Sequence, residues 1–118
     1  MKKTVKKIQK YKIENKKIAA LTAYDFYTAK YIDSAGIDLI LVGDSAANVV
    51  LGYNTTTQIT IDEMLIFTSA VARGAKEALV VADMPFLSYN VSIEKAIENA
   101  GKFIVKGADA VKIDGGSD

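Results

Sequence analysis

Four short apolar runs that lack an alternation of polar and apolar residues constrain the fold of this 118-residue chain more than any other feature. They cover residues 18–21, 39–42, 78–82 and 108–113. Strands that are buried on both faces of a parallel sheet have this composition, whereas half-exposed strands alternate. We therefore expect four buried strands.

Between these runs, apolar residues recur at helical spacing, most clearly from Ile61 to Thr68 and from Ile93 to Ile104. Residues that cap helix N-termini precede the helical segments, and glycines follow two of them, as at helix C-termini. These boundary residues are Asp25, Thr60 with Glu63, Ser92, Gly36 and Gly107. The pattern predicts strand and helix in alternation.

Three strand–helix repeats followed by a final strand require a parallel sheet with right-handed crossovers. Open doubly wound sheets and closed barrels both begin in this way. No Gly/Ser linker divides the chain, so we expect residues 1–118 to form a single α/β domain. Val5, Ile8 and Tyr11 recur among eight lysines near the N-terminus, which favours a short amphipathic helix with a solvated basic face.

Composition limits the chemistry available to the chain. Fifteen basic and 14 acidic side chains give a net charge of +1, which argues against nucleic-acid and membrane-surface partners. The N-terminal segment has neither a transit-peptide composition nor a signal-peptide core, so we expect a cytoplasmic protein. Because the chain has no cysteine and no histidine, catalysis would rest on Asp, Glu, Lys, Ser, Thr or Tyr.

Polar side chains lie at or just after the ends of the predicted strands: Asp44, Ser45, Asp83, Lys112 and Asp114. The carboxyl ends of parallel strands lie at one edge of a sheet, so these groups should converge. Three carboxylates without His or Cys form a hard-oxygen set suited to Mg²⁺, and a lysine could hold an anionic substrate. The alternative is that single aspartates merely cap the segments that follow.

Two further segments invite interpretation. The connection between residues 43 and 59 is long for a compact fold, and connections of that length often carry function. Tyr24, Tyr27 and Tyr31 are spaced as on one helix face, and we interpret all three as packing residues.

Five motifs in order resemble the ketopantoate hydroxymethyltransferase (3-methyl-2-oxobutanoate hydroxymethyltransferase) family. They are LTAYD at 21–25, AGIDLILVGDS at 35–45, VVLGY at 49–53, VADMPFLSY at 81–89 and GADAVKIDGG at 107–116. The resemblance covers nearly the whole chain after about residue 8. It implies a (β/α)₈ TIM barrel, of which this chain would be the N-terminal half.

The resemblance also implies an activity: Mg²⁺-dependent transfer of a hydroxymethyl group from 5,10-methylenetetrahydrofolate to 3-methyl-2-oxobutanoate, in pantothenate biosynthesis. Asp44, Asp83 and Asp114 would hold the metal, and Asp44, Ser45, Asp83 and Lys112 would bind the keto acid. The full-length protein would be a homo-oligomer. The family's general base would lie beyond Asp118, so no residue here is assigned that role.

Several departures from the family pattern qualify this interpretation. Asp114 stands where the family has glutamate and is one methylene shorter, which leaves open whether it would bind the metal directly or through a water. A (β/α)₈ barrel takes roughly 250 residues, and half of one leaves two strand edges unpaired. One alternative is therefore a non-catalytic remnant or interaction module. Another is a barrel of the isocitrate lyase and phosphoenolpyruvate mutase kind, which shares the TAYD-like opening.

Overall fold

The computed structural model describes residues 2–85 and 92–113, which form a four-stranded parallel sheet in the order β1-β2-β3-β4. The strands are β1 (Ala20–Thr22), β2 (Leu39–Val42), β3 (Leu79–Asp83) and β4 (Ala110–Lys112). Each one coincides with a predicted apolar run to within two residues at its start and its end. The predicted strands and their parallel arrangement are thus confirmed.

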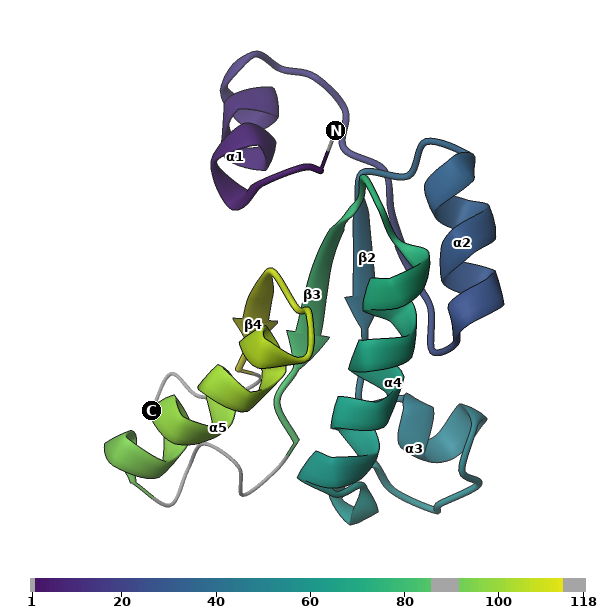
Figure 1. Cartoon of the computed structure of the whole chain (residues 1–118), viewed down its shortest axis with the longest axis vertical. Helices are drawn as coiled ribbons and strands as arrows, with labels where there is room; N and C mark the ends of the chain where they lie inside the picture. The colour runs from purple at the N-terminus through teal and green to yellow at the C-terminus, as the bar shows by residue number, and fades with distance from the viewer. Residues whose placement is uncertain (1, 86–91, 114–118) are drawn as a thin grey trace.

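Helices alternate with the strands, as Figure 1 shows. They are α1 (Val5–Ile13), α2 (Phe26–Ser34), α3 (Ala46–Val49), α4 (Ile61–Gly74) and α5 (Ile93–Val105), with a 3₁₀ turn, η1, at Thr56–Gln58. Asp25, Thr60 and Ser92 each accept a backbone N–H in the first helical turn, as predicted. No helix among the described residues is both long and apolar enough to cross a membrane.

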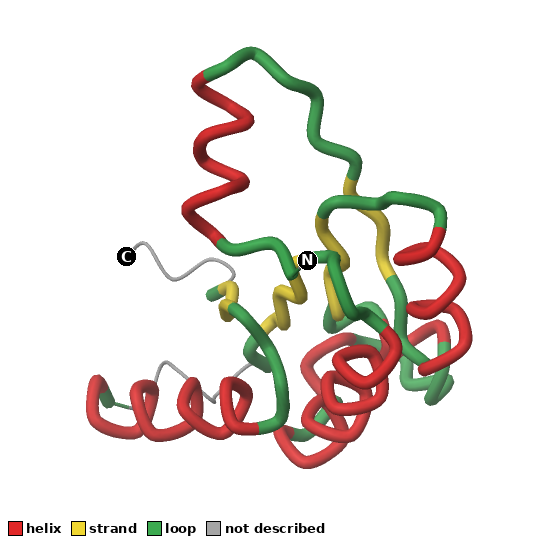
Figure 2. Tube along the Cα trace, turned by 45° about the horizontal axis from the view of Figure 1, so that its top comes forward, coloured by secondary structure: helices red, strands yellow, loops and turns green. Residues whose placement is uncertain are grey.

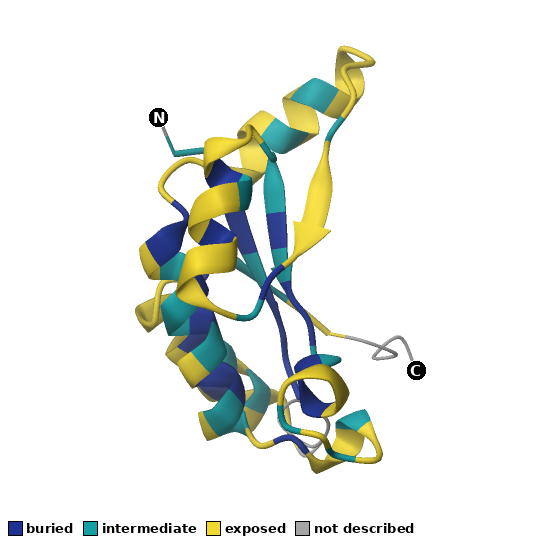
Figure 3. Ribbon diagram, turned by 90° about the vertical axis from the view of Figure 1, so that its right-hand side faces the viewer, coloured by how far each residue is buried: buried dark blue, intermediate teal, exposed yellow. Residues whose placement is uncertain are grey.

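The strand order distinguishes between the two parallel architectures that the sequence left open. A doubly wound sheet reverses its strand order and carries helices on both faces, whereas here each strand pairs with the next one along the chain. The helices α2, α4 and α5 lie on one side of the sheet, and no described helix covers the other side (Figure 3). This is the arrangement of the first half of a (β/α)₈ barrel.

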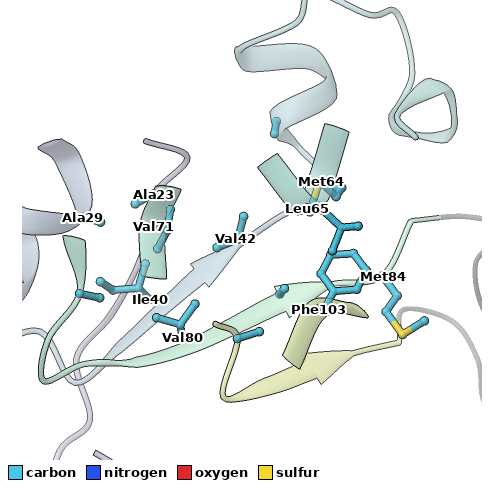
Figure 4. Close-up of a cluster of buried hydrophobic side chains, with 14 of the residues drawn as sticks. Ala23, Ala29, Ile40, Val42, Met64, Leu65, Val71, Val80, Met84 and Phe103 are labelled. Atoms are coloured by element: carbon cyan, nitrogen blue, oxygen red, sulfur yellow. The ribbon is translucent and has the colours of Figure 1, made fainter. Parts of the chain in front are cut away.

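The hydrophobic core lies between the sheet and these helices (Figure 4). Ile40, Val42 and Val80 are fully buried on the helix-covered face, together with Met64 and Phe103 from the helices. Burying an aliphatic or aromatic side chain of this size contributes about 1.5–3 kcal/mol. Packing on this single face therefore accounts for much of the stability of the chain.

The predicted burial of every strand on both faces is wrong for β1. All three of its residues are exposed, and Leu21 keeps 49% of its surface accessible. β1 is an edge strand, and the second face of the sheet has no cover among the described residues. The central strand β3, which has neighbours on both sides, is buried along nearly its whole length.

Aspartates at the end of the sheet where the strands begin accept hydrogen bonds from backbone amides. Asp33, at the end of α2, accepts hydrogen bonds from the N–H groups of Lys76 at 3.0 Å, Glu77 at 3.1 Å and Ala78 at 2.7 Å. Burial raises the pKa of this carboxyl, but the three backbone N–H groups together outweigh burial and hold the pKa below its ordinary value. The carboxylate thereby ties α2 to the start of β3.

Two lysines attach the N-terminal segment to the same edge. Lys2 Nζ lies 2.9 Å from Asp109 Oδ2, and Lys3 Nζ lies 3.6 Å from Asp38 Oδ1. Each of these aspartates also accepts a backbone N–H, from Val80 and Ala19 respectively. The basic helix α1 follows these contacts and stands apart from the other helices, beyond the ends where the strands begin (Figures 1 and 2).

We predict that Asp33→Asn lowers the free energy of unfolding by about 2 kcal/mol, because an amide replaces a carboxylate oxygen and leaves a buried N–H without an acceptor. Urea unfolding followed by circular dichroism measures the change. The matched control is Asp62→Asn in the exposed first turn of α4, for which we expect a change below about 0.5 kcal/mol. Equal stabilities of the two variants would contradict the assignment.

The same carboxyl should make stability depend on pH. Because folding lowers the pKa of Asp33, its ionised form is favoured in the folded state, and its contribution is complete above the ordinary aspartate pKa. That contribution is lost as the pH falls from there through the lowered folded-state pKa. When urea unfolding is measured at assay pH values between 5 and 2, the free energy of unfolding should fall less for Asp33→Asn than for the unmodified chain.

Candidate active site

The ends of β3 and β4 bring an acid and a base onto the open face of the sheet. Asp83 and Lys112 are paired in register, so their side chains leave the sheet on the same face. The Met84 N–H donates to the Lys112 carbonyl at 2.9 Å and extends the pairing past Asp83. Two of the predicted site residues, 29 positions apart in the sequence, are thus neighbours.

The end of β2 joins this pair through Asp83. The Asp44 backbone N–H donates to Asp83 Oδ2 at 3.1 Å. A Cβ on residue 43 would lie 3.3 Å from Ser45 Oγ and 3.5 Å from Asp83 Oδ2, so the glycine at this position lets both groups approach the backbone closely. The structure therefore brings Asp44, Ser45 and Asp83 together, as the strand-end pattern predicted.

Asp83 carries the most informative atom of the site. The residue is only 7% exposed, and its Oδ1 is buried without a hydrogen-bond partner among the described residues. A buried carboxylate oxygen without a partner is costly unless a ligand or cation satisfies it. Mg²⁺ prefers oxygen ligands of this kind, so Asp83 fits the metal that the resemblance implied.

The third predicted metal ligand, Asp114, lies outside the described residues, as do Gly115 and Gly116. Within residues 2–85 and 92–113, no group of three or more acidic side chains gathers closely enough to hold a metal ion. The predicted three-carboxylate set therefore stays a prediction.

A contact that the sequence did not predict joins the end of β1 to that of β2. The Tyr24 hydroxyl and Ser45 Oγ are hydrogen-bonded at 2.5 Å, and both residues are half-buried. The interpretation of Tyr24, Tyr27 and Tyr31 as packing residues is wrong for Tyr27 and Tyr31, which are 65% and 70% exposed. The available signal was the position of Tyr24 two residues after the end of β1, but its helical spacing with Tyr27 and Tyr31 favoured another interpretation.

The connection between residues 43 and 59 is more ordered than a loop, since it contains α3 and η1. Tyr53 Oη donates to Glu63 Oε2 at 2.6 Å, which ties the connection to the first turn of α4. This hydrogen bond raises the pKa of Tyr53 and lowers the pKa of Glu63. The connection therefore holds a defined path beside the site.

An open hollow of about 450 Å³ extends from Lys112 across the uncovered face of the sheet. Leu39, Leu41, Val81 and Thr22 line it. The hollow combines an apolar floor with one cation at its edge, which suits a small organic anion.

Comparison with known proteins identifies the family. A family model described as "Ketopantoate hydroxymethyltransferase" matches residues 2–118. The chain belongs to the ketopantoate hydroxymethyltransferase family. The resemblance inferred from the five motifs is confirmed.

Relatives named 3-methyl-2-oxobutanoate hydroxymethyltransferase share more than half of the aligned residues with this family member. The protein from Kosmotoga olearia is 58% identical over 87% of this chain and 39% of its own length. Those from Thermotoga maritima and Nitrosopumilus maritimus are 57% and 53% identical, over 97% and 99% of this chain and 42% of their own lengths. The chain thus spans about two fifths of these relatives.

Solved structures confirm the fold of this family member. A phosphonopyruvate hydrolase in complex with oxalate and Mg²⁺ matches 92% of the chain and 38% of its own, with a TM-score of 0.73 at 14% identity. The 2,3-dimethylmalate lyase, a member of the PEP mutase/isocitrate lyase superfamily, matches 81% of the chain and 34% of its own, with a TM-score of 0.67 at 23% identity. These neighbours are TIM-barrel enzymes.

We predict that, in buffer that contains a metal chelator, the substitution Asp83→Asn leaves the free energy of unfolding unchanged or raises it by up to about 1 kcal/mol. The amide oxygen can still accept the Asp44 N–H, while the cost of a buried charge without a full set of partners disappears. Urea unfolding measures the difference. A loss above about 1 kcal/mol, like that expected for Asp33→Asn, would make Asp83 a structural residue instead.

Proposed function

We propose that this chain supplies the metal and keto-acid part of a 3-methyl-2-oxobutanoate hydroxymethyltransferase site. The reaction transfers a one-carbon unit from 5,10-methylenetetrahydrofolate to 3-methyl-2-oxobutanoate, consumes one water and yields ketopantoate and tetrahydrofolate. The single observation that carries the proposal is the buried Oδ1 of Asp83, which has no hydrogen-bond partner among the described residues and lies beside Asp44, Ser45 and Lys112. Family membership gives that site its reaction.

Each residue has a role that follows from its chemistry. Asp83 would bind Mg²⁺ through Oδ1, while its Oδ2 continues to accept the hydrogen bond from the Asp44 N–H. Asp44 and Asp114 would be the other protein ligands of the metal. Bound Mg²⁺ supplies Lewis-acid chemistry, which acidifies the C–H next to the keto group.

Lys112 and Ser45 would hold the keto acid. An exposed ammonium at the edge of the hollow attracts the carboxylate as a point charge, and the serine hydroxyl can donate a hydrogen bond. The apolar floor formed by Leu41 and Val81 suits a branched alkyl group. These surfaces support the substrate class that family membership suggests, a small branched α-keto acid.

The general base is not assigned to this chain. The folate co-substrate, the cytoplasmic location and homo-oligomerisation of the full-length protein likewise stand as predictions from the resemblance and the sequence. The non-catalytic alternative would keep keto-acid binding without turnover. A turnover assay with 5,10-methylenetetrahydrofolate separates it from the transferase when it is made on a protein that also carries the segment expected to hold the general base.

We predict that the 118-residue chain binds 3-methyl-2-oxobutanoate only when Mg²⁺ is present. Isothermal titration calorimetry measures the affinity with Mg²⁺ and with a chelator. Asp83→Asn should weaken Mg²⁺-dependent binding at least about tenfold, because a charged metal ligand is lost. Lys112→Ala should weaken keto-acid binding about tenfold and leave Mg²⁺ binding unchanged.

The matched control is Lys102→Ala on α5, which removes an exposed lysine away from the sheet ends and should not affect binding. Equal affinity with and without Mg²⁺, or equal losses in the two lysine variants, would contradict the proposal.

A further inference from the structure

The hydroxyl of Ser45 has a hydrogen-bond partner that affects whether it can donate to a ligand. Tyr24 leaves the end of β1 through Ala23, whose N–H donates to the Leu41 carbonyl at 3.2 Å and keeps the two strand ends aligned. The Tyr24 hydroxyl then lies 2.5 Å from Ser45 Oγ. A side chain from one strand end thus contacts the candidate ligand-binding hydroxyl of the next.

The two hydroxyls differ in how well they donate. A phenol is far more acidic than an aliphatic alcohol, so Tyr24 is the better donor of the pair, and Ser45 Oγ is the better acceptor. When Tyr24 donates to Ser45 Oγ, the hydroxyl proton of Ser45 is free to bind another acceptor. A hydroxyl oxygen that accepts one hydrogen bond becomes a stronger donor in the next. A serine held in this state offers a hydrogen bond to an anionic or carbonyl oxygen.

The Ser45 hydroxyl lies next to the other groups of the candidate site. A Cβ on residue 43 would contact both Ser45 Oγ and Asp83 Oδ2, so the serine hydroxyl lies near the carboxylate expected to hold the metal. The exposed Tyr27 and Tyr31 on α2 have no such contact among the described residues. Only one tyrosine of the three is therefore placed to act on Ser45.

We infer that Tyr24 is a positioning residue that holds the Ser45 hydroxyl as a hydrogen-bond donor toward an oxygen of the bound α-keto acid. This inference rests on the proposed function, because it takes the keto acid as the ligand of Ser45. It adds a residue that acts through Ser45 and does not itself contact the substrate. Its effect belongs to keto-acid affinity and not to the binding of the metal.

The test is a double-mutant cycle on the 118-residue chain with Mg²⁺ and 3-methyl-2-oxobutanoate. Tyr24→Phe keeps the ring and removes only the hydroxyl, and we expect it to weaken keto-acid binding about fivefold, the effect of one hydrogen bond. Ser45→Ala should weaken binding by a similar factor. The double variant should lose little more than either single variant, because both changes break the same chain of hydrogen bonds.

Two readouts separate positioning from a structural role. Mg²⁺ affinity measured without keto acid and the midpoint of thermal unfolding should be the same in Tyr24→Phe and the unmodified chain. The matched control is Tyr27→Phe, which removes the hydroxyl of an exposed tyrosine of α2 and should leave keto-acid affinity unchanged.

The outcomes distinguish the two proposals. If the unmodified chain binds the keto acid and Tyr24→Phe binds equally well, or if the losses in the two single variants add in full, the inference is overturned while the proposed function stands. If Tyr24→Phe lowers Mg²⁺ affinity and keto-acid affinity together, Tyr24 is structural and the inference also fails. If the unmodified chain binds no keto acid in Mg²⁺, the proposed function of this chain fails, and the inference that rests on it fails too.

Discussion

Parallel pairing of four strands in sequence order is the constraint on which the rest of this structure depends. Each crossover must return the chain to the start of the next strand. All strands therefore begin at one end of the sheet, called its starting edge here, and finish at the opposite end, its finishing edge. Short strands of three to five residues suffice, because the helices on one face supply the hydrophobic core. The two edges are then free to take on different chemistry.

The aspartates at the two edges show how different that chemistry is. At the starting edge, Asp33 accepts three backbone N–H groups. At the finishing edge, Asp83 accepts one described N–H, and its other oxygen is buried without a partner among the described residues. The first arrangement stabilises the fold, whereas the second costs stability that a bound cation can recover. The same residue type thus stabilises the fold at one end of the strands and is available to a ligand at the other. The hydrogen-bond partners of each aspartate distinguish the two roles.

Local physics explains which features were predictable. Ser92, Thr60 and Asp25 cap their helices because a short polar side chain satisfies the first backbone N–H groups wherever a helix starts. The exposure of β1 was not predictable, because an apolar run in the sequence does not indicate whether both faces of the strand are covered. The role of Tyr24 was missed for a related reason: its helical spacing with Tyr27 was visible, whereas its contact with Ser45 depends on two adjacent strand ends.

The sequence by itself determined the alternation of strands and helices, the caps, the family and the set of polar residues at the strand ends. These follow from side-chain chemistry over a few neighbouring positions and from motifs in order. Only the tertiary structure decided that the strands pair in sequence order and that the described helices cover one face of the sheet. It also decided that Asp83 Oδ1 is buried without a partner among the described residues, and that Tyr24 contacts Ser45. Those properties depend on which strands become neighbours, and a hydrogen bond between residues 21 positions apart exists only after the sheet has formed.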